Sequence, residues 1–150
     1  MQSLNLPTYS FKIKSEGDRK FIFDRFRKKY VVLTPEEWVR QHLALFLVNE
    51  KSFPAGRIVV EKTLKFNKME RRCDLLVYGD SSPSLIVECK APEVKISQNV
   101  FDQIAVYNLE FRVKYLVVSN GIDHYCCKVD FQSGEIQFLK DIPEYHEINI

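Results

Sequence analysis

The sequence lacks the features that would place the chain in a membrane, outside the cell or in a repeat array. No apolar run approaches the roughly 20 residues of a membrane span. The opening MQSLNLPTYS has neither the basic start nor the apolar middle of a signal peptide. Only 5 of the 150 residues are glycine, and no Gly/Ser or Pro-rich linker or internal repeat divides the chain. These absences predict one cytoplasmic domain over residues 1–150, without a membrane partner.

The cysteines also lack the pattern of a metal site. The chain has 4 of them, with no C-x-x-C pair and no histidine at zinc spacing. In a cytosolic setting their thiols stay reduced. We therefore predict that Cys73, Cys89, Cys126 and Cys127 pack as small apolar groups.

Strong net charge is absent as well, but basic residues gather in two runs. A formal charge of +2 does not by itself indicate nucleic-acid binding. The runs R-F-R-K-K (25–29) and K-T-L-K-F-N-K-M-E-R-R (62–72) interleave cations with aromatics. Alone, each run is more often a solvated strand edge or turn. The runs indicate DNA binding only if they flank a catalytic site. The candidate DNA contacts are Arg25, Arg27, Lys28, Lys29, Lys65, Lys68, Arg71 and Arg72.

The first third of the chain predicts a hairpin followed by a helix. Residues 10–14 and 20–24 alternate apolar and polar side chains around S-E-G-D-R. In L-T-P-E-E-W-V-R-Q, Thr34 suits a helix cap and Pro35 the first helical position, with Glu37 three residues after the cap. The helix should end near residues 49–53. Its apolar face would comprise Val39, Leu43, Phe46 and Leu47.

Glu36 or Glu37, at the start of this helix, could also reach a neighbouring site as an extra metal ligand. A capping box explains Glu37 without a metal, and we favour that interpretation.

The middle of the chain predicts an antiparallel meander. Three strand-like segments cover residues 58–66, 72–78 and 85–90, separated by the turn-rich N-K-M-E-R and G-D-S-S-P. A second helix follows from Ser97 to Leu109, with Val100, Phe101, Ile104 and Leu109 facing inward.

The last third predicts a buried strand and a second hairpin. K-Y-L-V-V-S-N-G is typical of a strand covered on both faces. Residues 125–139 indicate a hairpin across Ser133 and Gly134. The order is helix, three strands, helix, strand, with a hairpin added at each end.

Three charged residues interrupt the apolar runs of the meander. Side chains of a strand alternate faces, so Glu88 and Lys90 share one face. If opposed residues have numbers that sum to 162, Asp74 lies opposite Glu88 and residues 79–83 form the loop. A sum of 163 would put the two acids on opposite faces. The first register predicts that two carboxylates and an ammonium meet.

Such a cluster has a chemical interpretation and a simpler alternative. Neighbouring carboxylates raise each other's pKa unless a cation lies between them, and hard oxygen ligands select Mg²⁺ or Mn²⁺. Lys90 would then stabilise charge on a phosphoryl group or position a water. The alternative is a surface salt bridge between Lys90 and either acid. Gln103 and Tyr107, four apart on the second helix, form a polar stripe that could orient the lysine.

These residues resemble a known superfamily. D-L-L-V-Y followed by I-V-E-C-K-A-P resembles the PD-(D/E)xK motif of restriction-endonuclease-like nucleases, and Q-I-A-V-Y resembles the Q-x-x-x-Y motif of its RecB-like branch. The chain is also similar to the N-terminal nuclease domain of the motor (R) subunit of type I restriction enzymes, through L-T-P-E-E-W-V-R-Q, R-R-C-D-L-L-V-Y, E-C-K-A-P, Y-N and V-V-S-N-G in this order. The resemblance spans about residues 20–127.

The resemblance implies an α/β core with a mixed β-sheet flanked by helices and a Mg²⁺- or Mn²⁺-dependent endonuclease acting on DNA. It implies Asp74, Glu88 and the carbonyl of Cys89 as metal ligands and Lys90 as the catalytic lysine. Gln103 and Tyr107 would be an auxiliary pair, and Glu61 or Glu37 a further ligand.

The chain departs from the family pattern in two respects. Cys73 replaces the proline before Asp74, and the 150 residues contain no P-loop. Cleavage would then be weakly sequence-specific, depend on a separate motor or other restriction-modification subunits, or be lost. A non-catalytic module that holds DNA or docks on a partner is the alternative, and a nuclease acting on RNA or branched DNA is a weaker one.

Overall fold

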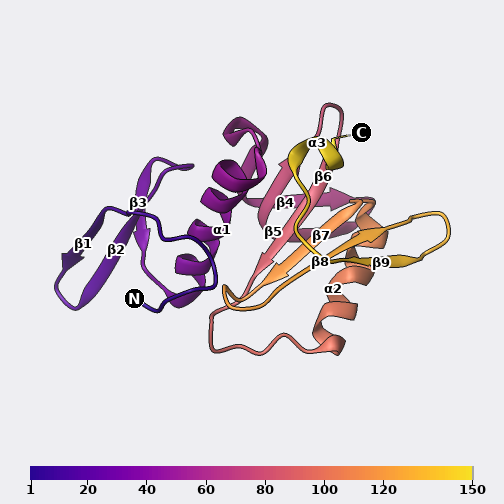
Figure 1. The fold of residues 1–150 in the computed structure, drawn as a ribbon. Coiled ribbons are helices and arrows are strands. Elements are labelled where there is room, and N and C mark those ends of the chain that lie inside the picture. The colour runs from indigo at the N-terminus through magenta and orange to yellow at the C-terminus, as the bar shows by residue number, and fades with distance from the viewer. Residues whose placement is uncertain (150) are drawn as a thin grey trace.

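Two β-sheets of different size lie on either side of helix α1 (Figure 1). The computed structural model describes residues 1–149, apart from the side chain of Tyr107. The smaller sheet has the order β1-β2-β3 and the larger β4-β5-β6-β7-β8-β9. The strands are β1 Ile13–Glu16, β2 Arg19–Asp24, β3 Lys29–Val32, β4 Ile58–Phe66, β5 Met69–Tyr78, β6 Pro83–Cys89, β7 Tyr115–Ser119, β8 His124–Val129 and β9 Ile136–Leu139. The α-helices are α1 Pro35–Lys51, α2 Gln98–Phe111 and α3 Tyr145–Ile148, and a 3₁₀ turn covers Ala55–Arg57.

Helix α1 begins where the sequence predicts. The backbone N–H of Glu37 donates to the Thr34 hydroxyl at 3.0 Å, and Pro35 occupies the first turn. The helix ends at Lys51, because Ser52 adopts a left-handed conformation with φ of 60°. Only half of the predicted capping box forms, since the Glu37 carboxylate accepts hydrogen bonds from Arg40 instead.

The larger sheet is mixed, as the resemblance implied. Strands β4, β5 and β6 form the predicted antiparallel meander, and β6 pairs with β7 in parallel through the crossover helix α2. Strands β7, β8 and β9 continue antiparallel. All five residues of β7 are buried, as expected for a strand covered on both faces.

Helices cover both faces of this sheet. Val39, Leu43 and Leu47 of α1 pack against residues such as Leu75 and Val87. On the other face, α2 contributes Phe101 and Ala105 to a second core with Leu76, Ile86 and Leu116. Burying each large aliphatic side chain stabilises the fold by about 1.5–3 kcal/mol. The four cysteines are free and buried, as predicted.

The register between β5 and β6 is the predicted one. Leu75, Leu76 and Val77 lie opposite Val87, Ile86 and Leu85, respectively. The predicted loop is one residue too long, because an irregularity after Val77 pairs Tyr78 with Pro83. The connection is therefore residues 79–82.

Three short elements were not predicted: strand β3, the 3₁₀ turn Ala55–Arg57 and helix α3. Strand β3 completes the N-terminal hairpin into a three-stranded sheet, and α3 forms one turn near the C-terminal end of the described residues. No helix within residues 1–149 is long and apolar enough to span a membrane.

Candidate active site

Asp74 lies where β5 and β6 separate. The β5–β6 ladder ends at the pair of Leu75 and Val87. One residue beyond it, Asp74 Oδ2 accepts a hydrogen bond of 2.7 Å from the backbone N–H of Cys89. The carboxylate thereby substitutes for a backbone acceptor and is fixed against the E-C-K segment.

Glu88, the acid of that segment, is held by a buried arginine. Arg71 donates to Glu88 Oε1 at 2.8 Å and to Asn108 Oδ1 of helix α2 at 2.7 Å. Asn108 is fully buried, and its amide group also donates to the carbonyl of Tyr115 at 3.2 Å. This chain of hydrogen bonds fixes the orientation of Glu88 relative to α2 and β7.

Lys90 is half-buried beside the two acids. Its backbone N–H donates to the Ser119 carbonyl at 2.8 Å, which anchors the end of the segment to β7. Burial raises the pKa of both Asp74 and Glu88, and the ammonium charge of Lys90 opposes this rise. Glu88 forms its ion pair with Arg71. The alternative of a simple surface salt bridge between Lys90 and Glu88 therefore does not fit this acid.

Burial disfavours ionisation of both acids. Burial is the largest cause that raises the pKa of Glu88, to about 7, and the Asp74 charge adds to it while Arg71 opposes it. Burial likewise raises the pKa of Asp74, opposed by the hydrogen bond from Cys89 and the charge of Lys90. The charges of Asp74 and Lys90 therefore both act on the pKa of Glu88, the first raising it and the second lowering it.

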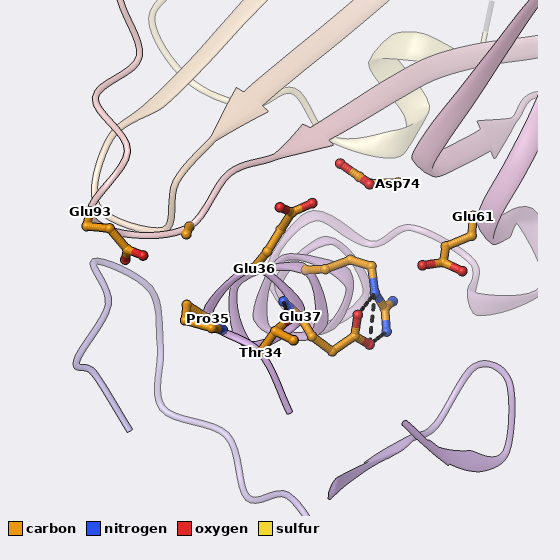
Figure 2. Close-up of a pocket in the computed structure, with 9 residues that line it drawn as sticks. Thr34, Pro35, Glu36, Glu37, Glu61, Asp74 and Glu93 are labelled. Carbon is orange, nitrogen blue, oxygen red and sulfur yellow. Dashed lines mark hydrogen bonds and ion pairs between the residues drawn. The ribbon is translucent and has the colours of Figure 1, made fainter. Parts of the chain in front are cut away.

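A pocket of about 440 Å³ opens beside Asp74, at the N-terminus of α1. Figure 2 shows Glu36 reaching from α1 toward Asp74, while Glu37 turns to the other side of the helix. Burial, followed by the charge of Asp74, raises the pKa of Glu36. Glu88 and Lys90 are not among the residues that line the pocket, which is formed by Thr34, Pro35, Glu36, Glu37, Arg40, Glu61, Asp74, Ala91 and Glu93.

The two acids predicted as further ligands are already engaged by arginines. Glu37 accepts hydrogen bonds from Arg40 and Arg27, and Glu61 accepts from Arg27 and Arg72 at 2.9 and 2.8 Å. These contacts lower the pKa of Glu61 against the opposing effect of burial. Of the acids near Asp74, Glu36 is therefore better placed than either to join a metal site.

The backbone of β4 is strained at Glu61, beside the pocket. Glu61 has a φ of 52°, a left-handed conformation that a non-glycine residue adopts at a cost of about 1 kcal/mol or more. The β4–β5 ladder pairs Val60 with Leu75 and Lys62 with Cys73, and omits the intervening Glu61–Asp74 pair. The distortion therefore lies directly opposite Asp74.

The predicted auxiliary pair is only partly described. Gln103 is exposed on α2. Tyr107 lies on the same helix, and its side chain is outside the described residues.

The predicted DNA contacts fall into three groups. In the first group, Arg71 is buried against Glu88, and Arg27 binds Asp24 at 2.7 Å as well as Glu37 and Glu61. Both guanidinium groups are therefore paired with carboxylates of the chain itself. Arg72 is exposed but pairs with Glu61, Lys65 pairs with Glu70 at 3.3 Å, and Arg25 donates to the Ser10 carbonyl. Lys28, Lys29 and Lys68 are exposed.

Sequence reasoning missed the roles of Arg71 and Arg40. Arg40 has a side chain only 3% exposed, and it binds Asp24 at 2.7 Å and also Glu37. It joins the N-terminal sheet to α1 and lines the pocket. Its i, i+3 spacing from Glu37 is a helix-pair signal in the sequence, whereas Arg71 has no such local signal.

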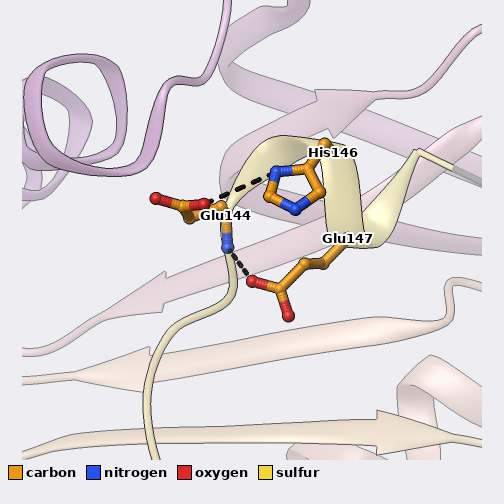
Figure 3. Close-up of side chains that lie close together, drawn as sticks. All are labelled: Glu144, His146 and Glu147. Carbon is orange, nitrogen blue, oxygen red and sulfur yellow. Dashed lines mark hydrogen bonds and ion pairs between the residues drawn. The ribbon is translucent and has the colours of Figure 1, made fainter.

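A second acidic cluster lies at α3. Within the described residues, the three possible metal ligands whose ligand atoms already lie together are Glu144, His146 and Glu147 (Figure 3). A capping box explains the two acids, because the Glu144 N–H donates to Glu147 Oε1 at 3.0 Å. We therefore assign this cluster to the start of a one-turn helix.

The acids near Asp74 offer the oxygen ligands that a hard divalent cation takes, but the described residues Asp74, Glu88 and Glu36 are not a group whose ligand atoms all lie within 4.8 Å of one another. Hydrogen bonds among the described residues engage one oxygen each of Asp74 and Glu88. The pKa of Asp74, Glu88 and Glu36 is raised, with a neighbouring acid among the causes for each. Carboxylate oxygens in this electrostatic setting are suitable ligands for Mg²⁺ or Mn²⁺.

The fold is an α/β domain in which Asp74 lies where two strands of a mixed sheet separate, next to the E-C-K segment. The chain belongs to the family described as the N terminus of the type I restriction enzyme R protein, whose sequence profile matches residues 35–143.

Structural comparison supports the same fold. The chain is similar to a fragment described as an HsdR subunit of a type I restriction enzyme from Vibrio vulnificus YJ016, with a TM-score of 0.55 and 22% identity. The match covers 77% of this chain and 24% of that chain, so the two share about a quarter of the longer protein. No curated protein matches the chain.

Proposed function

We propose that the domain is a Mg²⁺- or Mn²⁺-dependent endonuclease that hydrolyses phosphodiester bonds of DNA. The observation that carries the proposal is the hydrogen bond between Asp74 and the Cys89 N–H, which joins an acid of β5 to the E-C-K segment of β6. Membership of the R-protein family supports it.

Each group has a role that follows from its position. Asp74 and Glu88 would hold the cation, with Glu36 as a neighbouring acid and the Cys89 carbonyl as a backbone ligand. The bound cation would supply Lewis-acid stabilisation of the phosphate and lower the pKa of a water. Lys90 would hold the attacking water or the developing phosphoryl charge by hydrogen bonding. Arg71 would orient Glu88 without contacting substrate.

Cleavage of supercoiled and linear DNA with Mg²⁺ or Mn²⁺ tests the proposal. Asp74→Ala and Lys90→Ala should each lower the rate by about 100-fold or more, and chelation by EDTA should abolish it. Glu70→Gln, which changes an exposed acid of the same strand, is the matched control and should cleave at the wild-type rate. Equal cleavage by the wild type and both site variants would identify the activity as a contaminant.

Exposed lysines favour a second candidate, a non-catalytic module that holds DNA or docks on a partner. Lys28, Lys29 and Lys68 could contact phosphates without a metal. This candidate expects salt-sensitive DNA binding that survives Asp74→Ala and shows no Mn²⁺ dependence. Tight Mn²⁺ binding that is lost in Glu88→Ala, measured by calorimetry, would count against it.

The partners of the domain are part of the proposal. We infer that other subunits of a restriction-modification system, or a separate motor, bring DNA to the site. A panel of duplex DNA, single-stranded DNA, branched DNA and RNA would identify the substrate.

A further inference from the structure

Strand β2 of the N-terminal sheet has one buried face and one open face. Ile22 and Asp24 are fully buried, whereas Phe21 and Phe23 are only partly buried. Because side chains alternate along a strand, each pair shares a face. Asp24 binds Arg40 of α1 at 2.7 Å, so the Ile22 face is turned to α1. Phe21 and Phe23 therefore point away from the helix.

The neighbouring strands extend this outward face. Phe23 lies opposite Tyr30, and Phe21 lies opposite both Lys14 and Val32. Tyr30 is 38% exposed and Val32 is 37% exposed. The rings of Phe23 and Tyr30 meet edge to face with 5.3 Å between centroids. The outcome is a partly exposed row of aromatic and apolar side chains on the outward face of the sheet.

Basic side chains lie over these aromatic rings. Lys14 Nζ is 4.4 Å from the centroid of Tyr30. Lys12 Nζ lies 5.7 Å from the Phe23 centroid, and the Arg19 guanidinium carbon 5.4 Å from the Phe21 centroid. The acid on this face, Glu16, pairs with Lys14 at 3.1 Å. Lys12, Lys14 and Arg19 thus place three cations on a face with one acid.

The basic charge of the chain is concentrated around this sheet. Residues 1–33 contain eight Lys and Arg and three acids, a net charge of +5, whereas the whole chain carries +2. The remainder is therefore net acidic. A polyanion would be attracted to the N-terminal sheet rather than to the body of the domain.

We propose that the outward face of the N-terminal sheet, formed by Lys12, Lys14, Arg19, Phe21, Phe23 and Tyr30, binds single-stranded DNA. Unpaired bases stack on the rings and the cations contact phosphates. An exposed cation–π contact contributes roughly 2- to 5-fold to an equilibrium constant, and stacking of one base contributes about 5- to 150-fold. A base therefore displaces a lysine from a ring, and the freed ammonium reaches the backbone.

This inference does not depend on the metal site. The contacts need no divalent cation, and duplex DNA cannot use the rings because its bases are already stacked. Binding measured in EDTA therefore separates the two proposals. If the chain does not cleave DNA, it can still bind single-stranded DNA in EDTA, and if it does not bind single-stranded DNA in EDTA, it can still cleave DNA with a metal.

Fluorescence anisotropy of a labelled oligo-dT of about 15 nucleotides, with the full chain in EDTA, tests the inference. The wild type should prefer oligo-dT over a duplex of equal length. Tyr30→Ala should weaken binding by about tenfold, and Tyr30→Phe, which keeps the ring, should bind like the wild type. Lys14→Ala should reduce the slope of log K against log salt concentration by about 0.7.

Phe138→Ala is the matched control. Phe138 is 55% exposed on β9 of the other sheet, so its removal should leave binding unchanged. Circular dichroism establishes that each variant is folded. Wild-type affinity in both Tyr30→Ala and Phe21→Ala would overturn the inference. Equal losses in Phe138→Ala, tighter binding of duplex DNA or of oligo-U, or no binding by the wild type would also overturn it.

Discussion

The backbone N–H of Cys89 donates to Asp74 Oδ2 at 2.7 Å, so the acid of β5 is fixed against the segment that carries Glu88 and Lys90. The ladder of the two strands ends next to this contact. A charged, largely buried carboxylate is unfavourable for folding, and the raised pKa of Asp74 reflects this cost of burial.

Replacing this charge should stabilise the fold while removing function. Asp74→Asn keeps a side-chain oxygen that can accept from the Cys89 N–H and removes the buried negative charge. We expect the free energy of unfolding at pH 8 to rise by roughly 0.5–1 kcal/mol, and Mn²⁺ binding to be lost. Urea denaturation and calorimetry measure the two effects. A large loss of stability would show that Asp74 is a structural residue.

Mn²⁺ affinity should depend on pH through Glu88. Its pKa is raised to about 7 from an ordinary value of 4.5, so ionising it costs stability as pH rises from about 4.5 to about 7. A cation needs the ionised form, so affinity should increase by up to about tenfold per pH unit below pH 7 and level off above it. Calorimetry from pH 5.5 to 8.5 measures this dependence. A flat profile in the wild type would contradict the assignment of Glu88 as a ligand.

Arg71 should matter most when Glu88 is charged. Arg71→Met leaves a largely buried carboxylate without its guanidinium partner, which should destabilise the chain by about 3 kcal/mol at pH 8 and by less at pH 5.5. Arg72→Met, which changes the exposed neighbour, is the control and should cost under about 1 kcal/mol. Glu88→Gln added to Arg71→Met should recover part of the loss. Equal losses at both pH values would show that charge pairing is not the cause.

Glu36 and Glu37 are adjacent but should behave differently. Glu36→Gln should weaken Mn²⁺ binding by about tenfold or more without a loss of stability, because Glu36 faces Asp74. Glu37→Gln should destabilise the fold by about 1–3 kcal/mol, since Glu37 pairs with the buried Arg40. Calorimetry and thermal unfolding of both variants give the comparison. The reverse pattern would assign the metal site to Glu37.

Most elements of the fold were predictable because their signals are local. Alternation in β5 and β6 sets the register that places Leu75 opposite Val87, and Thr34 with Pro35 sets the start of α1. Strand β3 was missed because it has four residues and begins inside the basic run at residues 25–29, and pairing with β2 holds it in the sheet.

The candidate site was harder to predict because its details depend on distant contacts. Arg71 lies in a basic run that suggests exposure, and its burial requires Asn108, 37 residues further along the chain. The left-handed φ of Glu61 has no sequence marker, because the residue is not glycine or asparagine. The preference for Glu36 over Glu37 depends on Arg40 and Arg27, which bind Glu37.

Anomalous scattering from a crystal soaked in Mn²⁺ tests the central claim most directly. The account predicts one strong peak within coordination distance, about 2.2 Å, of carboxylate oxygens of both Asp74 and Glu88. A peak at Glu144 and Glu147 alone, or no peak near Asp74 at millimolar Mn²⁺, would contradict it.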